Sequence, residues 1–284
     1  MAVKYGVNTF IWAASFECSH LPLLAEIKAH GFDGVELPLL QPARVPAREI
    51  RKGLAENGLE CTFCSVLPSG LSLIDDDAAV RRAASTHLSD CVKVAADIGG
   101  EILAGPLYSP VGYLPGRRRT QDEVDRAVEA WQALADTLAV NRVTVALEPL
   151  NRFETYFLNT VADAVALCRS IGSPRVGVLF DTFHANVEEK DVAAALRSAG
   201  PFLKHLHLCE NDRGTPGSGH VDWPGVFRAI HELNYAGWLT IESFGFALGE
   251  LSAAASIWRD LAPQPQDIAF EGVKFLKKSW NTSS

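Results

Sequence analysis

The chain has 284 residues, of which 48% are hydrophobic and 21% charged, and this composition favours one large globular domain over two small ones. The 34 Asp and Glu residues outnumber the 26 Lys and Arg residues, so the formal net charge is −8, which argues against a nucleic acid partner because a phosphate backbone selects a basic surface. No stretch approaches the roughly 18 apolar residues that span a membrane, and the first residues do not resemble a signal peptide, so we expect a cytoplasmic protein without a membrane partner.

Short strand-like runs alternate with amphipathic helical segments along almost the whole chain. The predicted strands are 5–10, 34–39, 60–66, 101–107, 144–149, 176–181, 204–209 and 239–243. Several helical segments end in a glycine shortly before the next strand, as a helix C-terminal cap does; these are Gly31, Gly58 and Gly172. Eight strand–helix units in about 250 residues are typical of a (β/α)8 TIM barrel. A doubly wound sheet is the alternative, and it is disfavoured because no glycine-rich dinucleotide turn is present.

No linker, low-complexity tract or change in composition divides the chain, so residues 1–284 are predicted to form a single domain. The stretch 263–267 has the composition of a loop, and it leads into an extra C-terminal helix with the sequence EGVKFLKKSW. The arginines at 117–119 follow the fourth strand, and such a charged run is usually a solvated surface. Tyr108 and Tyr113 lie near the same loop, and we expect both to be exposed, in a lid or a subunit contact.

Six cysteines are scattered through the chain, and Cys61 and Cys64 form a C-x-x-C pair. Both lie in the predicted strand 60–66, where residues three apart point to opposite faces. A redox or zinc pair normally lies in a turn instead. We therefore expect two buried thiols at these positions.

Four side chains that can bind a metal fall at the carboxyl ends of the last four predicted strands, and in a barrel this end forms the active site. They are Glu148, Asp181, His207 and Glu242. An ionisable group at the end of an apolar strand is costly to bury without a partner. Three carboxylates and one imidazole suit a divalent ion such as Mn²⁺, Mg²⁺ or Co²⁺. His205 points to the same face as His207, and it is a packing residue, a partner of the ligand or the ligand itself.

Each of these residues has an ordinary interpretation when it is taken alone. An acidic residue at a strand end is most often a helix cap or a member of an ion pair, and a single histidine is usually a core residue. The joint pattern on four successive strands favours the metal site. An ion with six coordination positions and four protein ligands keeps two positions for a bidentate substrate.

The words that surround these residues resemble a known family. They are EPLNRFETYFLNT at 148–160, FDTFHANVEE at 180–189, HLHLCENDRGTPGSG at 205–219, IESF at 241–244 and SIWRDL at 256–261. The chain resembles the D-tagatose (D-psicose) 3-epimerase and L-ribulose 3-epimerase family of the xylose-isomerase-like sugar isomerase/epimerase superfamily. The resemblance runs over nearly the full chain and is looser in the first half, where Asn8–Trp12 and residues 104–120 depart from the family pattern.

The resemblance implies that Glu148, Asp181, His207 and Glu242 bind the metal, with Mn²⁺ as the first choice. It also implies that three further residues hold the sugar hydroxyls, namely Glu154, His184 and Arg213, and that the protein is a homodimer or homotetramer. Without the resemblance, Glu154 and Arg213 would be interpreted as solvated loop residues. The departures in the first half leave open which sugar is the substrate.

A physical mechanism follows for a ketose 3-epimerase that acts on a free sugar such as D-tagatose, D-psicose, D-fructose or L-ribulose. A C–H group beside a ketone is a weak acid, and a metal lowers the barrier by binding the carbonyl oxygen and spreading the enediolate charge. Glu148 and Glu242 come from strands three apart around the barrel, so they can flank C3 on opposite faces. One takes the proton and the other returns it, while His184 and Arg213 donate to the carbonyl oxygen and Glu154 accepts from a hydroxyl.

Other functions on the same barrel are weighed as alternatives. A 1,2 aldose–ketose isomerase or a 4-epimerase of a 3-keto-glycoside would use the same metal and glutamates. A phosphorylated substrate would require the arginines at 117–119 to close over the site. An endonuclease-IV-like nuclease needs more histidines than the eight present. A sugar-binding protein with a decayed site is disfavoured because both glutamates are retained.

Overall fold

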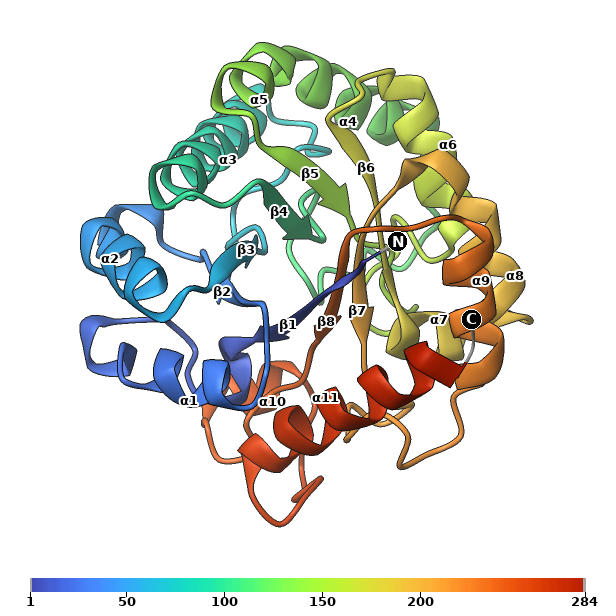
Figure 1. The fold of residues 1–284 in the computed structure, drawn as a ribbon. Helices are drawn as coiled ribbons and strands as arrows, with labels where there is room; N and C mark the ends of the chain where they lie inside the picture. The colour runs from blue at the N-terminus through green and yellow to red at the C-terminus, as the bar shows by residue number, and fades with distance from the viewer. Residues whose placement is uncertain (1, 283–284) are drawn as a thin grey trace.

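The computed structural model describes residues 2–282, and its eight parallel strands close into a barrel in sequence order (Figure 1). The first strand pairs with both the second and the last, which closes the sheet. The predicted TIM barrel is therefore confirmed. The strands are β1 Lys4–Asn8, β2 Gly34–Pro38, β3 Glu60–Cys64, β4 Ile102–Gly105, β5 Thr144–Leu147, β6 Val176–Asp181, β7 Leu203–Leu208 and β8 Trp238–Ile241.

The helices form a ring outside the strands (Figure 1). They are α1 Leu23–Ala29, α2 Ala47–Asn57, α3 Ala78–Ile98, α4 Gln121–Ala133, α5 Ala135–Asn141, α6 Val161–Ile171, α7 Thr182–Glu188, α8 Val192–Ala199, α9 Trp223–Glu232, α10 Glu250–Ala254 and α11 Pro265–Thr282. Four short 3-10 helices add to these, η1 Thr9–Ile11, η2 Cys18–His20, η3 Pro42–Arg44 and η4 Gly200–Phe202. Within residues 2–282, none of the helices combines the length and apolar character that crossing a membrane requires.

Local chemistry fixes where the helices begin and end. Thr120 and Thr160 cap α4 and α6, because each side chain accepts a hydrogen bond from a backbone N–H in the first turn. In both helices an acidic side chain of that turn accepts from the backbone N–H of the threonine, which completes a capping box. At the other end, Gly58 and Gly172 close α2 and α6 in the left-handed conformation that glycine adopts without strain. Gly31 follows α1 with a φ of 86°, so all three predicted glycine caps end their helices.

The predicted strands extend beyond the observed ones, mostly at the carboxyl end. The fourth strand was predicted over 101–107 and ends at Gly105, which has a φ of 126°. A Cβ atom at Gly105 would lie 2.2 Å from the backbone oxygen of Ser65, the residue that follows β3, so only glycine allows this close approach. The chain therefore turns away from the barrel there, although the next residues are still apolar.

The last helix begins earlier than predicted. Residues 265–267 form the first turn of α11 rather than a loop, and the Asp267 carboxylate accepts a hydrogen bond from the backbone N–H of Gln264 at 3.0 Å. A proline is tolerated at this position because the first helical N–H has no intrahelical acceptor.

The core fills both sides of the sheet, as parallel strands require. All residues of β2 and β6 are buried, and the expected thiols Cys61 and Cys64 are buried and free. Burial raises the pKa of Cys61 to about 12, so this group is a protonated thiol at neutral pH.

One loop prediction is wrong. Tyr108 is fully buried, and its hydroxyl donates a 3.0 Å hydrogen bond to the backbone carbonyl of Glu148; only Tyr113 is exposed, at 55%. In the arginine run, which is largely exposed as predicted, Arg117 and Arg119 form ion pairs with Glu123 and Asp163 at 2.7 and 2.5 Å. These pairs hold the loop against α4 and α6.

Candidate active site

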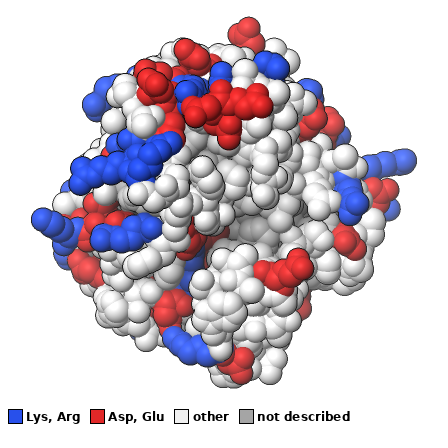
Figure 2. Space-filling view, turned by 180° about the vertical axis from the view of Figure 1, so that it is seen from behind, with Lys and Arg blue, Asp and Glu red and all other residues white. Residues whose placement is uncertain are grey.

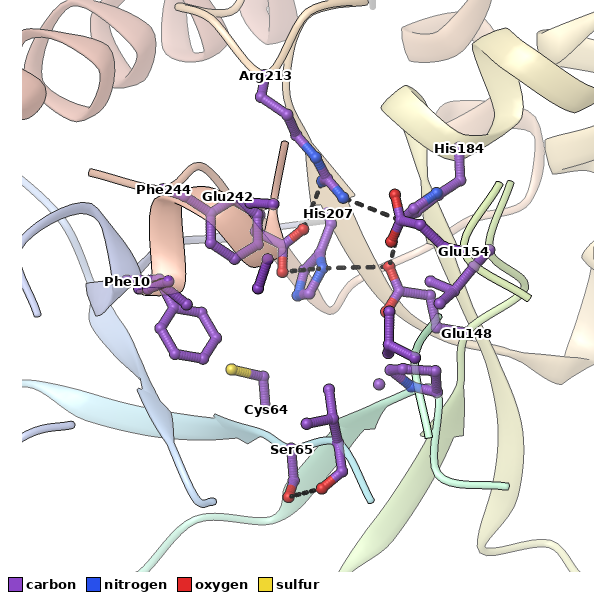
Figure 3. Close-up of a pocket in the computed structure, with 18 of the residues that line it drawn as sticks. Phe10, Cys64, Ser65, Glu148, Glu154, His184, His207, Arg213, Glu242 and Phe244 are labelled. Atoms are coloured by element: carbon purple, nitrogen blue, oxygen red, sulfur yellow. Dashed lines mark hydrogen bonds and ion pairs between the residues drawn. The ribbon is translucent and has the colours of Figure 1, made fainter. Parts of the chain in front are cut away.

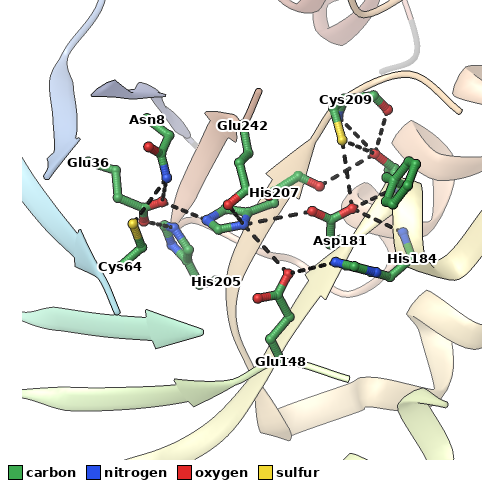
Figure 4. Close-up of polar contacts among 12 residues, drawn as sticks. Asn8, Glu36, Cys64, Glu148, Asp181, His184, His205, His207, Cys209 and Glu242 are labelled. Carbon is green, nitrogen blue, oxygen red and sulfur yellow. Dashed lines mark hydrogen bonds and ion pairs between the residues drawn. The ribbon is translucent and has the colours of Figure 1, made fainter. Parts of the chain in front are cut away.

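The four predicted metal ligands meet at the carboxyl end of the barrel. Glu148 follows β5, Asp181 ends β6, His207 lies on β7 and Glu242 follows β8. One potential ligand atom from each lies within 4.8 Å of the others, and every one of these residues is at most 5% exposed (Figure 4). The four-strand pattern in the sequence therefore corresponds to one buried cluster.

The Nδ1 atom of His207 lies at the centre of this cluster. It is 3.2 Å from Oε1 of Glu242, 3.8 Å from Oδ2 of Asp181 and 3.9 Å from Oε1 of Glu148. Neither this Nδ1 atom nor Oε1 of Glu148 has a hydrogen-bond partner among residues 2–282. Buried polar atoms without partners are rare, and a nitrogen lone pair facing carboxylates fits a divalent cation of the Mn²⁺, Mg²⁺ or Co²⁺ type.

The two glutamates of the cluster have opposite acidities. Burial and the neighbouring Glu242 raise the pKa of Glu148 well above its usual range. Burial acts in the same direction on Glu242, but His207 and Arg213 outweigh it and lower the pKa of Glu242 to about 2. A pair of carboxyl groups whose environments separate their pKa values is what acid–base catalysis requires.

Arg213 is not a solvated loop residue. It is 6% exposed, and its Nη1 donates to Oδ2 of Asp181 at 2.8 Å and to Oε2 of Glu242 at 2.5 Å. Its guanidinium carbon lies 4.2 Å from the centre of the Phe183 ring, a cation–π contact. The backbone of Arg213 has a φ of 68°, a strained conformation that is typical of functional sites.

His184 has a defined tautomer. Burial and Arg213 lower its pKa to about 3, so the imidazole is neutral at neutral pH. The backbone N–H of Asn151 donates to Nδ1 at 3.0 Å, and the single proton therefore lies on Nε2. This Nε2 is 2.9 Å from Nη2 of Arg213 and 3.6 Å from Oε1 of Glu148 (Figure 3). Two donors thus converge on one point beside the cluster.

Glu154 lies on the same wall of the pocket as His184 (Figure 3). Its Oε1 accepts a 2.7 Å hydrogen bond from Nδ2 of Asn151, and burial raises its pKa. Asn151 therefore contacts both His184 and Glu154, a role that we did not assign from the sequence although Asn151 lies inside the EPLNRFE word.

The rest of the pocket lining is mainly apolar. Phe10, from η1, stacks on Phe244 with 5.4 Å between ring centres, and both line the pocket with Leu40, Val66 and Val111 (Figure 3). Figure 2 shows the molecule from behind the view of Figure 1, and near the middle of this face is a hollow with charged side chains inside it and a largely uncharged rim. In the first-strand segment that departs from the family pattern, Phe10 lines the pocket and Trp12 packs against Phe270 instead.

Glu36 on β2 is a residue that sequence reasoning missed. It is fully buried, and its two oxygens contact Nε2 of His205 at 2.7 Å and Nε2 of His207 at 2.6 Å (Figure 4). His205 is thus a partner of the cluster rather than one of its four members. The only sequence signal was a single carboxylate inside an otherwise apolar strand, GVELP.

Comparison with known proteins gives a consistent family. Residues 24–279 match the model of the xylose isomerase-like TIM barrel family. The chain is 39% identical to a probable ketose 3-epimerase of Synechocystis sp., covering 99% of this chain and 98% of the relative, and 34% identical to L-ribulose 3-epimerase of Mesorhizobium japonicum, covering 91% and 88%. The crystal structure of D-allulose 3-epimerase from Methylomonas sp. with D-allulose superimposes with a TM-score of 0.93, at 28% identity and over 98% of this chain and 97% of that one.

Proposed function

We propose that this protein epimerises C3 of a free ketose with the help of a divalent metal. The chain belongs to the xylose isomerase-like TIM barrel family and within it to the ketose 3-epimerases, which are isomerase-class enzymes. The observation that carries the proposal is the convergence of Glu148, Asp181, His207 and Glu242 within one buried cluster. The two glutamates of this cluster have opposite acidities, and the donors of His184 and Arg213 point at its edge.

The proposed metal ligands are Glu148, Asp181, His207 and Glu242. The unpartnered Nδ1 of His207 and Oε1 of Glu148 support this assignment, and the mixture of oxygen and nitrogen atoms suits Mn²⁺, with Mg²⁺ and Co²⁺ as further choices. When bound, such an ion polarises the ketone and stabilises the negative charge that develops as the neighbouring C–H bond breaks.

Proton transfer at C3 is assigned to Glu148 and Glu242. They follow β5 and β8, so they approach the substrate from different sides of the barrel mouth. One carboxylate removes the C3 proton from one face, and the carboxyl group opposite delivers a proton to the other face.

His184, Arg213 and Glu154 are proposed to hold the sugar oxygens around the reacting carbons. Nε2 of His184 and Nη2 of Arg213 are both donors and lie 2.9 Å apart, so they can share one acceptor oxygen of the substrate. Glu154 keeps its second oxygen, since only Oε1 accepts the bond from Asn151, and that oxygen can accept from a hydroxyl.

A free sugar fits better than a phosphorylated one. Arg117 and Arg119 are already paired with Glu123 and Asp163. The pocket wall away from the cluster carries Phe10, Leu40, Val66 and Val111 rather than cationic groups. A terminal phosphate would meet this apolar wall without a charged partner, which is costly.

Product analysis tests the proposal. The Mn²⁺-loaded protein is incubated separately with D-fructose, D-tagatose, D-psicose, L-ribulose and a 3-keto-glycoside, and the products are separated by chromatography. Conversion of at least one of these to its C3 epimer supports the proposal. Formation of an aldose instead identifies a 1,2-isomerase, and turnover of a 3-keto-glycoside alone identifies a 4-epimerase.

The proposal includes a homodimer or homotetramer. Phe153 and Trp258 are 73% and 77% exposed and line a common cleft beside Arg213. Exposed aromatic side chains at one place are typical of contact surfaces, and burying them between subunits would remove apolar area from water. Light scattering coupled to size-exclusion chromatography measures the mass, and a monomer at all concentrations contradicts this part.

A further inference from the structure

Glu36 accepts four hydrogen bonds in the middle of the barrel. Its Oε1 accepts from Nδ2 of Asn8 at 3.0 Å and faces Nε2 of His207 at 2.6 Å. Its Oε2 accepts from Oγ1 of Thr62 at 3.0 Å and faces Nε2 of His205 at 2.7 Å. Four bonds use all the lone-pair positions that a carboxylate offers, so Glu36 carries no proton and both imidazoles are donors through Nε2.

These contacts cross the barrel interior. Glu36 lies on β2, whose neighbours are β1 and β3, whereas both histidines lie on β7, between β6 and β8. All three side chains are fully buried, and the two imidazole planes meet at 78° with 5.2 Å between their centres. The carboxylate is therefore held by His205 on one oxygen while it holds His207 with the other (Figure 4).

The tautomer of His207 follows from this arrangement. An imidazole that binds a metal is neutral and has one proton, and for His207 the contact with Glu36 places this proton on Nε2. The lone pair is then on Nδ1, which is the atom that faces Glu242, Asp181 and Glu148. Both Nε2 atoms and both carboxylate oxygens are used in these contacts, so we assign Glu36, His205 and His207 to hydrogen bonding rather than to a second metal site.

We propose that Glu36 is a positioning residue that fixes the tautomer and orientation of His207, so that Nδ1 is presented as a metal ligand. The inference rests on the metal site of the proposed function. Carboxylates that orient a metal-binding histidine typically change metal affinity about 10–100-fold when they are replaced. In this chain, the contact of His205 with Oε2 keeps the Glu36 carboxylate from rotating.

Metal affinity of a matched pair of variants tests this role. Glu36→Gln replaces one acceptor oxygen by an amide donor, which cannot accept from an Nε2–H. The Kd for Mn²⁺, measured by electron paramagnetic resonance of free Mn²⁺, is expected to rise about 10–100-fold. Thr62→Val removes one donor to Oε2 and leaves the contact with His207, so its Kd should stay near that of the wild type.

A spectroscopic signal separates positioning from a general structural effect. The visible absorption bands of the Co²⁺-loaded protein report the ligand geometry, and they should shift in Glu36→Gln and not in Thr62→Val. Circular dichroism in the presence of a chelator shows whether each variant is folded. Equal Mn²⁺ affinity in folded Glu36→Gln and wild type overturns the positioning role while the metal site itself stands.

A measurement on the unchanged protein covers the case in which Glu36→Gln does not fold. Long-range ¹H–¹⁵N correlation spectra of the ¹⁵N-histidine-labelled protein, in chelator and with Mg²⁺, identify which ring nitrogen is protonated. With Mg²⁺ bound we expect the single proton of His207 on Nε2, and a proton on Nδ1 in the Mg²⁺-loaded protein overturns the inference. A wild type that binds no Mn²⁺ at all overturns the proposed metal site instead, and with it the role that rests on it.

Discussion

Nε2 of His184 lies 2.9 Å from Nη2 of Arg213. The backbone N–H of Asn151 occupies Nδ1 of His184 and so makes Nε2 a donor, and Nη2 of an arginine is always a donor. Two donors at this separation have no favourable interaction with each other. One acceptor oxygen within hydrogen-bond distance of both nitrogens, next to the cluster of acidic side chains, would satisfy them together. This relationship is the basis for assigning both residues to substrate binding.

Arg213→Lys is expected to lower kcat/KM for the preferred ketose by about 100-fold, because a single ammonium nitrogen lacks the planar fork that places Nη1 on the carboxylates and Nη2 beside His184. Steady-state kinetics measure the loss. Arg259→Lys is the matched control, since Arg259 is exposed and forms an ion pair with Asp212 outside the cluster. Equal kinetic constants for Arg213→Lys and the wild type would remove Arg213 from the site.

Removal of metal is expected to abolish activity, and Mn²⁺ is expected to restore it. Binding to the folded state alone also raises the melting temperature by mass action. Asp181→Asn should lose this Mn²⁺-dependent rise. The asparagine can still cap α7 as Asp181 does, by accepting from the backbone N–H of Phe183, and the melting temperature of each protein in chelator is the baseline from which its rise is measured. A full Mn²⁺-dependent rise in Asp181→Asn is incompatible with its role as a ligand.

Glu123 is expected to contribute to stability in a defined pH range. Burial alone would raise its pKa, but hydrogen bonds from Arg117, the backbone of Thr120 and Tyr156 outweigh it and lower the pKa to about 2. The folded-state pKa is thus below the unfolded value, so this stability is fully present above about pH 4.5 and is lost as the pH falls toward 2.

Urea unfolding as a function of pH tests this assignment. The difference in unfolding free energy between the wild type and Glu123→Gln should be constant from pH 5 to 8 and shrink steadily below about pH 4.5. A difference that does not depend on pH contradicts the lowered pKa. Glu232→Gln serves as a control, because its carboxylate is solvent-exposed and pairs with the side chain of Arg197, which is also exposed, and such pairs contribute little.

Gly105→Ala is expected to destabilise the barrel by at least about 2 kcal/mol, since it adds a Cβ 2.2 Å from the Ser65 oxygen at a φ of 126°. Gly70→Ala is the control, because it has a positive φ of 84° but open space around it, and it should cost about 1 kcal/mol. Chemical denaturation measures both. Similar losses at the two positions would mean that Gly105 is restricted by its positive φ alone and not by its close approach to the Ser65 backbone.

The sequence predicts the parts of this molecule that have a local signal. The strand 176–181 is correct at both ends because Asp181 interrupts an apolar run and Thr182 begins α7 there. The fourth strand was predicted too long because apolar residues continue past Gly105 into buried loop structure. Tyr108 was predicted to be exposed because nothing in the adjacent residues reveals its hydrogen bond to the backbone of Glu148.

Long-range partners set the limit of prediction in the site. Glu36 stands 169 and 171 residues before the two histidines that it contacts, and no spacing rule connects them. The four proposed ligands were identified together only because each ends a strand of one barrel, which brings the strand ends to one place. Burial of Arg213 depends on its pairing with Asp181 and Glu242, which also lies beyond local sequence.

The central claim is that Glu148 and Glu242 move a proton at C3, and solvent deuterium measures this directly. The Mn²⁺-loaded protein is incubated in D₂O with the ketose that it converts, and the sugars are followed by NMR. We predict deuterium at C3 of the epimer, and loss of both exchange and product in Glu148→Gln and Glu242→Gln that still bind Mn²⁺. Epimer that forms without deuterium at C3, or exchange that persists in both variants, would contradict the claim.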